Sequence, residues 1–418
     1  MNKPSPKEFP HVDWSRNSNI YEVNIRQYTP EGTFRAFEKH LPRLKEMGVD
    51  ILWLMPIQPI GMKNRKGSLG SYYSIKDYLA VNPEFGTVED FKRLVDKIHD
   101  LKMRVIIDWV ANHTAWDHLW ATEHPDWYKK NEQGEIHSYI FDHGSEQECW
   151  TDVIGLDYSN KELWSAMIEA LKYWVREFDI DGYRCDVAGL VPTPFWETAR
   201  AELEKIKPVF MLAEWSTPEL HEKAFDMTYD WDFYDLMTEF MKGGKNAQDL
   251  VKYILKRREI YGEDAYRMMF TTNHDKNSWN GSDTELLGPA FKAFAVLAMT
   301  LPGFPLIYGG QESILDKRLA FFEKDPIDWK TYEYTGFYKD LLRMKKLNKA
   351  LWNGRQGGEI SILPAMDEAI FAFTRKKDEN QVTVIVNLSD KPRKVAADKA
   401  SEEFTLEEWG FRIIPGLK

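Results

Sequence analysis

The sequence predicts an α/β protein built on a (β/α)8 TIM barrel, with a short inserted lobe after the third strand and a C-terminal antiparallel β domain. Short apolar runs typical of buried strands alternate with amphipathic helical segments about eight times, which indicates a parallel barrel. After about residue 340 the pattern changes to apolar runs separated by polar turns. The 418 residues accommodate both parts, because such a barrel takes roughly 250 residues.

The expected domains follow from these changes of pattern. We expect the barrel in residues 1–112 and 156–340, the inserted lobe in 113–155 and a β-sandwich-like domain in 341–418. The expected barrel strands are 20–24, 51–54, 105–108, 181–186, 209–214, 227–230, 268–275 and 306–308. The expected helices are 33–47, 87–101, 164–178, 195–206, 250–260 and 290–300.

The helix over 164–178 gives the clearest periodicity, because its apolar residues recur at three- and four-residue steps. The chain leaves it through Asp181-Gly182 and continues as a strand. Side chains alternate along a strand, so Arg184 and Asp186 are expected on one face. Residues 113–155 lack a strong period and carry many aromatic side chains, whereas 370–374 and 382–386 are expected to be antiparallel strands.

Composition excludes several classes of protein. The formal net charge of −11 argues against nucleic acid as a partner. Cys149 and Cys185 make no disulfide framework, and no Cys/His spacing indicates zinc. The apolar window 293–308 contains Pro302 and Pro305, which favours a helix followed by a strand over a membrane span. Residues 1–7 contain no apolar leader, so a cytoplasmic location is expected, or a periplasmic or secreted one if a signal has been removed.

Four expected strands end in or near a carboxylate, namely Asp108, Asp186, Glu214 and Asp275. In a barrel of this kind the active site lies at the carboxyl ends of the strands. Each acid alone could instead cap the following helix, but that alternative explains four together poorly. A cluster of carboxylates suits either a Mg²⁺ or Ca²⁺ site or the hydrolysis of glycosidic bonds.

Aromatic residues favour glycoside hydrolysis, because aromatic faces stack on sugar rings. They lie in or beside the expected mouth loops, as Tyr72, Tyr73, Trp109, Trp116 and Trp215; ordinary core packing is the alternative for each. Arg184 would keep Asp186 ionised, as a nucleophile requires, and apolar neighbours would desolvate Glu214, as a general acid requires.

These residues resemble the motifs of the α-amylase family of retaining glycoside hydrolases. The resemblance rests on four ordered segments, Asp108-Trp-Val-Ala-Asn112-His113, Gly182-Tyr-Arg184-Cys-Asp186, Leu212-Ala-Glu214-Trp215 and Asn273-His274-Asp275. Tyr73 is similar to the tyrosine that stacks on the sugar at the cleavage point, and Pro305–Glu312 resembles the eighth strand and its loop.

The resemblance implies cleavage of α-1,4-glucosidic bonds in starch, maltodextrins or related α-glucans by double displacement. It assigns Asp186 as nucleophile, Glu214 as general acid/base and Asp275 as the residue that stabilises the transition state. It also implies that Tyr73, His113, Arg184, Trp215 and His274 contact or orient the substrate, with Asp108 supporting Arg184. The alternatives are a transglycosylase or a cyclomaltodextrinase or α-glucosidase of the same family, a non-catalytic relative and a metal-dependent barrel hydrolase.

One departure affects the expected metal dependence. Many members follow the nucleophile with a Lys-His pair that serves the leaving-group side and a calcium ion, whereas this chain has Gly189 and Leu190. The inserted lobe is also short for a calcium-dependent amylase. We therefore expect no required cofactor, no metal ligands and no obligatory Ca²⁺; the sequence leaves the oligomeric state open.

Overall fold

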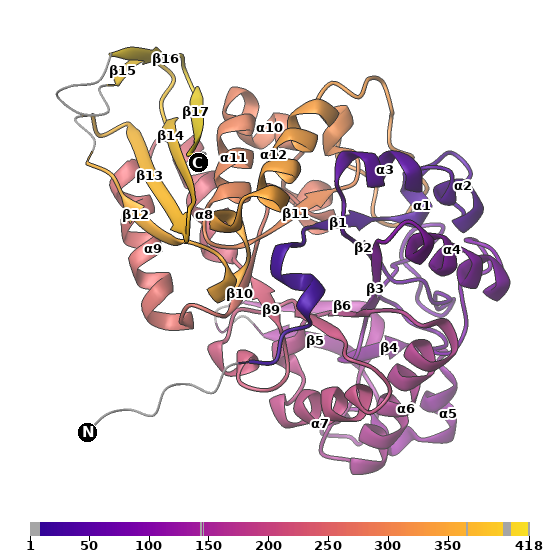
Figure 1. Cartoon of the computed structure of the whole chain (residues 1–418). Coiled ribbons are helices and arrows are strands. Elements are labelled where there is room, and N and C mark those ends of the chain that lie inside the picture. Colours follow the sequence, from indigo (N-terminus) through magenta and orange to yellow (C-terminus); the bar gives the residue numbers. More distant parts are fainter. Residues whose placement is uncertain (1–8, 143, 145, 365–366, 396–402, 417–418) are drawn as a thin grey trace, which may run out of the picture.

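The computed structural model describes residues 9–142, 144, 146–364, 367–395 and 403–416 (Figure 1). Residues 1–7, on which the expected location depends, lie outside these ranges. No helix within the described part of the chain is long and apolar enough to cross a membrane. The apolar window 293–308 forms most of helix α11 (Phe291–Thr300) and strand β11 (Phe304–Tyr308), as predicted.

A closed barrel of parallel strands forms the centre of the molecule and confirms the predicted fold class. Its strands, in chain order, are β1 (Ile20–Val23), β2 (Ile51–Leu54), β3 (Arg104–Trp109), β7 (Gly182–Cys185), β8 (Phe210–Ala213), β9 (Met227–Tyr229), β10 (Tyr266–Met269) and β11. The register pairs Asp108 on β3 with Arg184 on β7, which places two candidate site residues side by side. Because all strands run the same way, their carboxyl ends form one mouth.

Helices surround this barrel (Figure 1). Their bounds are α1 (Ile25–Tyr28), α2 (Phe34–Glu38), α3 (Leu41–Met47), α4 (Val88–Asp100), α5 (Leu119–Glu123), α6 (Lys161–Phe178), α7 (Thr193–Glu204), α8 (Trp231–Met241), α9 (Ala247–Tyr261), α10 (Asp283–Leu287), α11 and α12 (Thr335–Leu347). The expected helix 33–47 is two helices, because Pro42 has no N–H to continue the hydrogen-bond ladder. Helix α8 was not predicted.

The turn between α6 and β7 has a steric cause. Asn160 caps the start of α6, and Asp179 ends it in a left-handed conformation with φ of 57°. Gly182 then begins β7 with φ of +151°, where a Cβ atom would lie 1.9 Å from the carbonyl oxygen of Phe210. Only glycine permits this approach of β7 to β8, so the Asp-Gly pair that predicted the turn also permits the strand pairing.

The strand expected over 268–275 ends earlier than predicted. β10 spans Tyr266–Met269, and its neighbours β9 and β11 pair with it only as far as Met268 and Met269. The next residues therefore leave the sheet as a loop, and His274 and Asp275 stand on that loop beyond the strand. This correction moves both residues into the mouth of the barrel.

Three smaller sheets accompany the barrel in the described part of the chain. Between β3 and α6 the chain forms an antiparallel sheet in the order β4-β6-β5, made of β4 (His113–Ala115), β5 (Ser138–Asp142) and β6 (Gln147–Gly155). The C-terminal sheet has the order β12-β13-β14-β17, made of β12 (Glu359–Ile362), β13 (Ile370–Lys377), β14 (Asn380–Asn387) and β17 (Phe411–Gly416). The strands β15 (Arg393–Val395) and β16 (Phe404–Leu406) pair beside it. This C-terminal part lies next to α9 and α11, away from α5 to α7 (Figure 1).

Candidate active site

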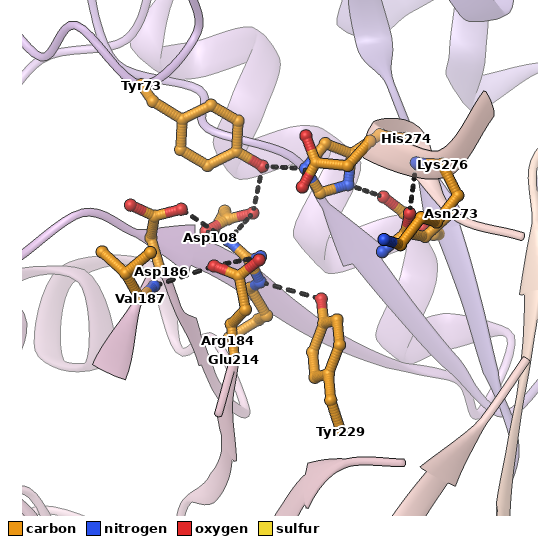
Figure 2. Close-up of polar contacts among 12 residues, drawn as sticks. Tyr73, Asp108, Arg184, Asp186, Val187, Glu214, Tyr229, Asn273, His274 and Lys276 are labelled. Atoms are coloured by element: carbon orange, nitrogen blue, oxygen red, sulfur yellow. Dashed lines mark hydrogen bonds and ion pairs between the residues drawn. The ribbon is translucent and has the colours of Figure 1, made fainter. Parts of the chain in front are cut away.

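The carboxylates singled out from the sequence meet at the carboxyl ends of the barrel strands (Figure 2). Asp108 lies in β3, Asp186 directly follows β7 and Glu214 directly follows β8. Asp275 comes from the loop after β10, and its side chain is the most accessible of the four at 34% exposed. The fold thus brings together residues that are far apart in the chain.

Arg184 is the centre of this cluster. Its buried guanidinium group lies 2.9 Å from Asp108 Oδ1 and 3.1 Å from Asp186 Oδ1 through Nη1, and 2.9 Å from Glu214 Oε2 through Nη2. Its Nε donates to the hydroxyl of Tyr229 at 3.1 Å. The shared face of Arg184 and Asp186 is therefore confirmed, and one buried cation offsets the negative charge of three neighbouring carboxyl groups.

Arg184 alone does not keep Asp186 ionised, which corrects the expectation from the sequence. Burial and the neighbouring Glu214 carboxylate raise the pKa of Asp186 well above its usual range, while Arg184 opposes this rise. Glu214 Oε2 accepts a hydrogen bond from the backbone N–H of Val187 at 2.8 Å in addition to its ion pair with Arg184. The Glu214 carboxylate therefore lies close enough to act on the charge of Asp186.

The backbone at Val187 supports this arrangement. Val187 has φ of 36°, in the left-handed region that a β-branched residue rarely adopts. This conformation begins the short 3-10 helix Ala188–Leu190 and turns the N–H of Val187 toward Glu214. Strained backbone of this kind concentrates at functional sites, where the surrounding structure maintains it.

Asp108 is fully buried and forms an ion pair with Arg184. It accepts hydrogen bonds from Trp53 Nε1 at 3.2 Å and from the Tyr73 hydroxyl at 3.1 Å. Burial raises the pKa of Asp108 to about 6, although Arg184 opposes the rise. These contacts agree with the expectation that Asp108 acts on Arg184.

His274 joins the cluster to a residue that the sequence did not reveal, Glu22 on β1. The ring Nδ1 lies 2.5 Å from Glu22 Oε1, whereas Nε2 lies 2.7 Å from the Tyr73 hydroxyl and 3.3 Å from Asp275 Oδ2. Tyr73 donates its own proton to Asp108, so its oxygen accepts from Nε2. Both ring nitrogens therefore face acceptors.

The imidazolium form satisfies all of these contacts. Burial opposes the positive charge, but Asp275 and Glu22 raise the pKa of His274 to about 9. The signal that could have revealed Glu22 is a lone carboxylate in the short apolar run Ile20–Val23. A buried carboxylate needs a partner, and here that partner is His274.

The other predicted substrate-binding residues differ in accessibility. Tyr73 is 8% exposed and stacks on His274 with ring centres 5.5 Å apart. His113 is buried against Tyr139 and Trp150, and burial lowers the pKa of His113 to about 3, so its ring is neutral. Trp215 is partly buried beside Glu214.

The indole ring of Trp215 fills the space beside the backbone of Gly189. A Cβ atom on Gly189 would lie 2.2 Å from the indole of Trp215, so a side chain at position 189 would displace that ring. The departure from the family motif at Gly189 therefore has a structural counterpart. Trp215 therefore lies against the backbone of Gly189.

Three aromatic residues expected near the mouth have other roles. Trp109 is fully buried between Tyr78 and Tyr183. Tyr72 is 1% exposed and packs against the guanidinium group of Arg26. Trp116 donates its indole N–H to the carbonyl oxygen of Thr151. For Trp109 and Tyr72 the core-packing alternative is the correct one.

Gly189 and Leu190, which stand where the resemblance places the calcium contact, offer no side-chain ligand. The amide nitrogen of Asn112 lies 3.2 Å from Nδ1 of His113. Among the described residues, no group of three or more His, Cys, Asp or Glu side chains is placed to hold a metal ion.

A barrel with paired carboxyl groups at its mouth, a third acid opposite them and a stacked tyrosine defines a sugar-cleaving type of enzyme. Comparison with known proteins supports this class. A sequence model described as "Alpha amylase, catalytic domain" matches residues 6–333. The chain therefore belongs to the α-amylase family and is a glycoside hydrolase.

Individual relatives agree. The chain is 27% identical to alpha-amylase 2 of Dictyoglomus thermophilum over 90% of its own length and 70% of that protein. It is similar to the crystal structure of an alpha-amylase from Lactobacillus plantarum, with 32% identity, a TM-score of 0.86 and coverage of 97% and 100% of the two chains. The maltogenic alpha-amylase AmyB from Thermotoga neapolitana gives 29% identity, a TM-score of 0.83 and 96% coverage of each chain.

Proposed function

We propose that this protein hydrolyses α-1,4-glucosidic bonds in maltodextrins and related α-glucans with retention of configuration. The observation that carries the proposal is the placement of Asp186 and Glu214 on one guanidinium group. Retaining glycosidases hold their two carboxyl groups about 5 Å apart, and two acids on one guanidinium group favour such a short separation.

In the first step Asp186 attacks the anomeric carbon and forms a covalent glucosyl ester. Glu214 donates its proton to the leaving glycosidic oxygen, and in the second step it takes a proton from the incoming water. Glu214 must therefore carry a proton, and Asp186 must be ionised, when substrate is bound. Its Oε1, which Arg184 and Val187 leave free, is the oxygen proposed to carry it.

Five further residues would bind the reacting sugar or orient the groups that act on it. Asp275, the most accessible acid, would bind ring hydroxyl groups and oppose the developing positive charge. Tyr73 would stack on the sugar ring, and His274 would orient Asp275 through Nε2. Arg184 would keep Asp186 aimed at the anomeric carbon. His113 would act as a neutral hydrogen-bonding group.

The first test removes each reacting carboxyl group without changing its shape. Asp186→Asn and Glu214→Gln should each lower kcat on maltoheptaose on the order of 10⁴-fold, because each removes a group that acts in the transition state. Glu219→Gln, an exposed glutamate in the loop after β8, is the matched control. NMR should show the α-anomer as the first product of the wild type. An initial β-anomer, or near-normal rates in either variant, would contradict the mechanism.

Transfer to a second sugar is the alternative outcome for the same intermediate. Trp215 places an aromatic surface beside Glu214, on the side where the leaving group departs and the acceptor arrives. Such a surface favours a sugar acceptor over water. Transglycosylation would appear as products longer than the substrate in the same NMR and chromatographic time course.

We further propose that activity and folding need no bound calcium, on the ground that Gly189 and Leu190 provide no ligand side chain. Dialysis against EDTA should leave Tm and kcat within error of the untreated protein. A Tm that falls by many degrees and is restored by Ca²⁺, but not by Mg²⁺, would contradict this expectation.

A further inference from the structure

A cavity of about 150 Å³ lies between the barrel and the C-terminal sheet. Its wall is formed by the end of α9, the start of β10, the turn before β11 and parts of β12 and β13. The C-terminal sheet lies next to α9 (Figure 1). The starts of β10 and β11 are the amino ends of barrel strands, so the cavity is remote from the reacting acids at the carboxyl ends.

The charge of the cavity wall is opposite to that of the whole chain. Among the described residues, five cationic and two acidic side chains line the cavity, a formal charge of +3 in a chain of −11. The cations are Arg257, Arg258, Arg355, Arg375 and Lys377, and the acids are Glu263 and Glu359. Arg258 and Arg355 are exposed at the edge, so the cavity can be reached from solvent.

Arg375, in the inner wall, is a buried cation without an acidic partner. Burial and the neighbouring Arg257 lower the pKa of Arg375 to about 9, and no carboxylate in the described part of the chain opposes them. The carbonyl oxygens of Thr300 and Leu301 contact Arg375 at the end of α11. The end of a helix supplies only about half an elementary negative charge, so part of the buried positive charge remains uncompensated.

The guanidinium group of Arg375 also keeps one N–H free. Its Nη2 carries two N–H groups and makes one hydrogen bond within the described ranges, to the carbonyl oxygen of Trp352 at 3.1 Å. A Cβ atom on Gly357 would lie 2.6 Å from this Nη2. Gly357 and Arg375 both line the cavity, so the missing side chain at position 357 leaves space beside the free N–H.

Arg257 adds a second guanidinium group that is only partly neutralised. Its Nε lies 3.2 Å from Asp230 Oδ2, but Asp230 also pairs with Nη2 of Arg267 at 3.8 Å, so two cations share one carboxylate. No hydrogen bond to another described residue uses Nη2 of Arg257. Its side chain is 13% exposed and lines the cavity.

Apolar side chains complete the wall, namely Ile254, Ala265, Pro302 and Ile360. Guanidinium groups bind the oxygens of carboxylates and phosphates, whereas apolar groups favour an apolar body. Pockets for drug-sized ligands measure roughly 300–1,000 Å³, so this smaller cavity suits a ligand of about one ring.

We infer that this cavity binds a small organic anion, whose carboxylate or phosphate head group contacts Arg257 and Arg375 and whose body lies against Ile254 and Pro302. The inference goes beyond the proposed function and does not depend on it. Because the wall comes from both the barrel and the C-terminal sheet, the bound anion stabilises their junction.

The test compares three one-ring compounds, phenyl phosphate, benzoate and uncharged benzyl alcohol, by calorimetry and thermal unfolding at constant ionic strength. At least one anion should bind with a Kd of about 1 mM or below, and at about ten times Kd it should raise Tm by about 1–2 °C. Benzyl alcohol should bind at least about tenfold more weakly, because it has no charge to pair with arginine. The tighter of the two anions identifies the head group.

Variants locate the bound anion. Arg375→Lys should weaken its Kd about tenfold, because the planar fork is lost. Arg355→Gln, which changes an exposed side chain and tests the site even if Arg375→Lys unfolds, should weaken it about twofold to fivefold. Lys256→Gln, which removes a charge on α9 outside the cavity wall, is the matched control and should leave the Kd unchanged.

Competition separates this cavity from the candidate active site. In Asp186→Asn, saturating maltoheptaose should leave the Kd of the anion unchanged. Displacement by maltoheptaose would overturn the inference. So would failure of both anions to bind, equal binding of benzyl alcohol, or a Kd that neither Arg375→Lys nor Arg355→Gln changes.

Discussion

At the scale of single residues, Arg184 shows how the site keeps several acids together. A buried guanidinium group is costly, and it persists because Asp108, Asp186 and Glu214 each contact it (Figure 2). The two proposed reacting acids each leave one carboxyl oxygen free of Arg184. Positioning and charge compensation thus come from the same group, while the reactive oxygens remain available.

Glu22 gives the first prediction at this scale. Glu22→Gln removes the negative charge opposite Nδ1 of His274, so the pKa of His274 should fall from about 9, because burial and Arg184 lower it and Asp275 alone then raises it. At pH 8 the ring should be mainly an imidazolium in the wild type, and its neutral fraction should be larger in the variant. The variant should lose about tenfold to a hundredfold in kcat/KM at that pH, because one charge-assisted hydrogen bond to Asp275 is lost.

Histidine ring ¹⁵N shifts at pH 8 measure this directly, with His274→Gln identifying the resonance. His221 is the internal control, because burial lowers the pKa of His221 to about 3 and its ring should be neutral in both proteins. Recovery of kcat/KM as the pH falls toward 6 would accompany the change. An imidazolium signal that persists in Glu22→Gln would contradict the role assigned to Glu22.

At the scale of elements, helix α10 carries a buried acid that the proposed mechanism does not use. Asp283 accepts from Gln311 Nε2 at 2.5 Å, and burial raises the pKa of Asp283 to about 7, against its ordinary value near 3.8. The folded protein therefore keeps a proton that the unfolded chain has lost between about pH 4 and 7. Stability from this group is complete below pH 4 and is lost as the pH rises through 7.

Asp283→Asn should remove that dependence, since an amide keeps the shape and cannot ionise. The variant should be more stable than the wild type at pH 8, by a few kcal/mol at most, with little difference at pH 4. Thermal unfolding at both pH values measures it. Glu285→Gln on the same helix is the contrast, because Arg318 and Ser282 lower the pKa of Glu285 and its loss should bring no gain at pH 8. An equal shift in Tm at both pH values for Asp283→Asn would contradict this account.

The elements also show what the sequence could and could not reveal. Strands ending in Asp108, Asp186 and Glu214 were predictable, because apolar runs of four to six residues define buried strands and their polar ends stand out. The pairing of Glu22 with His274 was not, because a strand shows which residues alternate but not which strand lies opposite. The distance between Glu22 and His274 depends on closure of the barrel between β1 and β11.

Sequence reasoning missed helix α8 and also an aromatic row, in which the ring of Tyr73 contacts Phe321 and Phe321 contacts Trp279. The two were missed for related reasons. The 11 residues of α8 are apolar on much of their surface, so their period is weak. The aromatic row joins the loop after β2 to the loops after β10 and β11, whose paths depend on tertiary contacts such as those of Asn277. Sequence periodicity carries no information on such contacts between loops.

At the scale of the whole molecule, the buried cation Arg375 joins the barrel to the C-terminal sheet. Arg375 on β13 is 1% exposed, and the contacts that the structure gives its guanidinium group are to backbone carbonyl oxygens. It donates to Thr300 and Leu301 at 3.2 and 3.1 Å, which end α11 in the barrel. It also donates to Trp352 and Gly358 at 3.1 and 3.2 Å, which lead into the C-terminal sheet.

Arg375→Met should therefore destabilise the protein on the order of 3 kcal/mol or more, because buried carbonyl oxygens lose their donor. Arg375→Lys keeps the charge but has fewer donors in one plane, so its free energy of unfolding should lie between those of Arg375→Met and the wild type. Lys376→Met, at the exposed neighbouring position on β13, is the matched control and should leave the free energy of unfolding nearly unchanged.

Urea unfolding gives these free energies even if thermal unfolding is irreversible. Since Arg375 lies in the C-terminal sheet and contacts no proposed site residue, kcat on maltoheptaose at 25 °C should be retained in Arg375→Lys. A stability equal to that of Lys376→Met would show that the junction does not depend on Arg375.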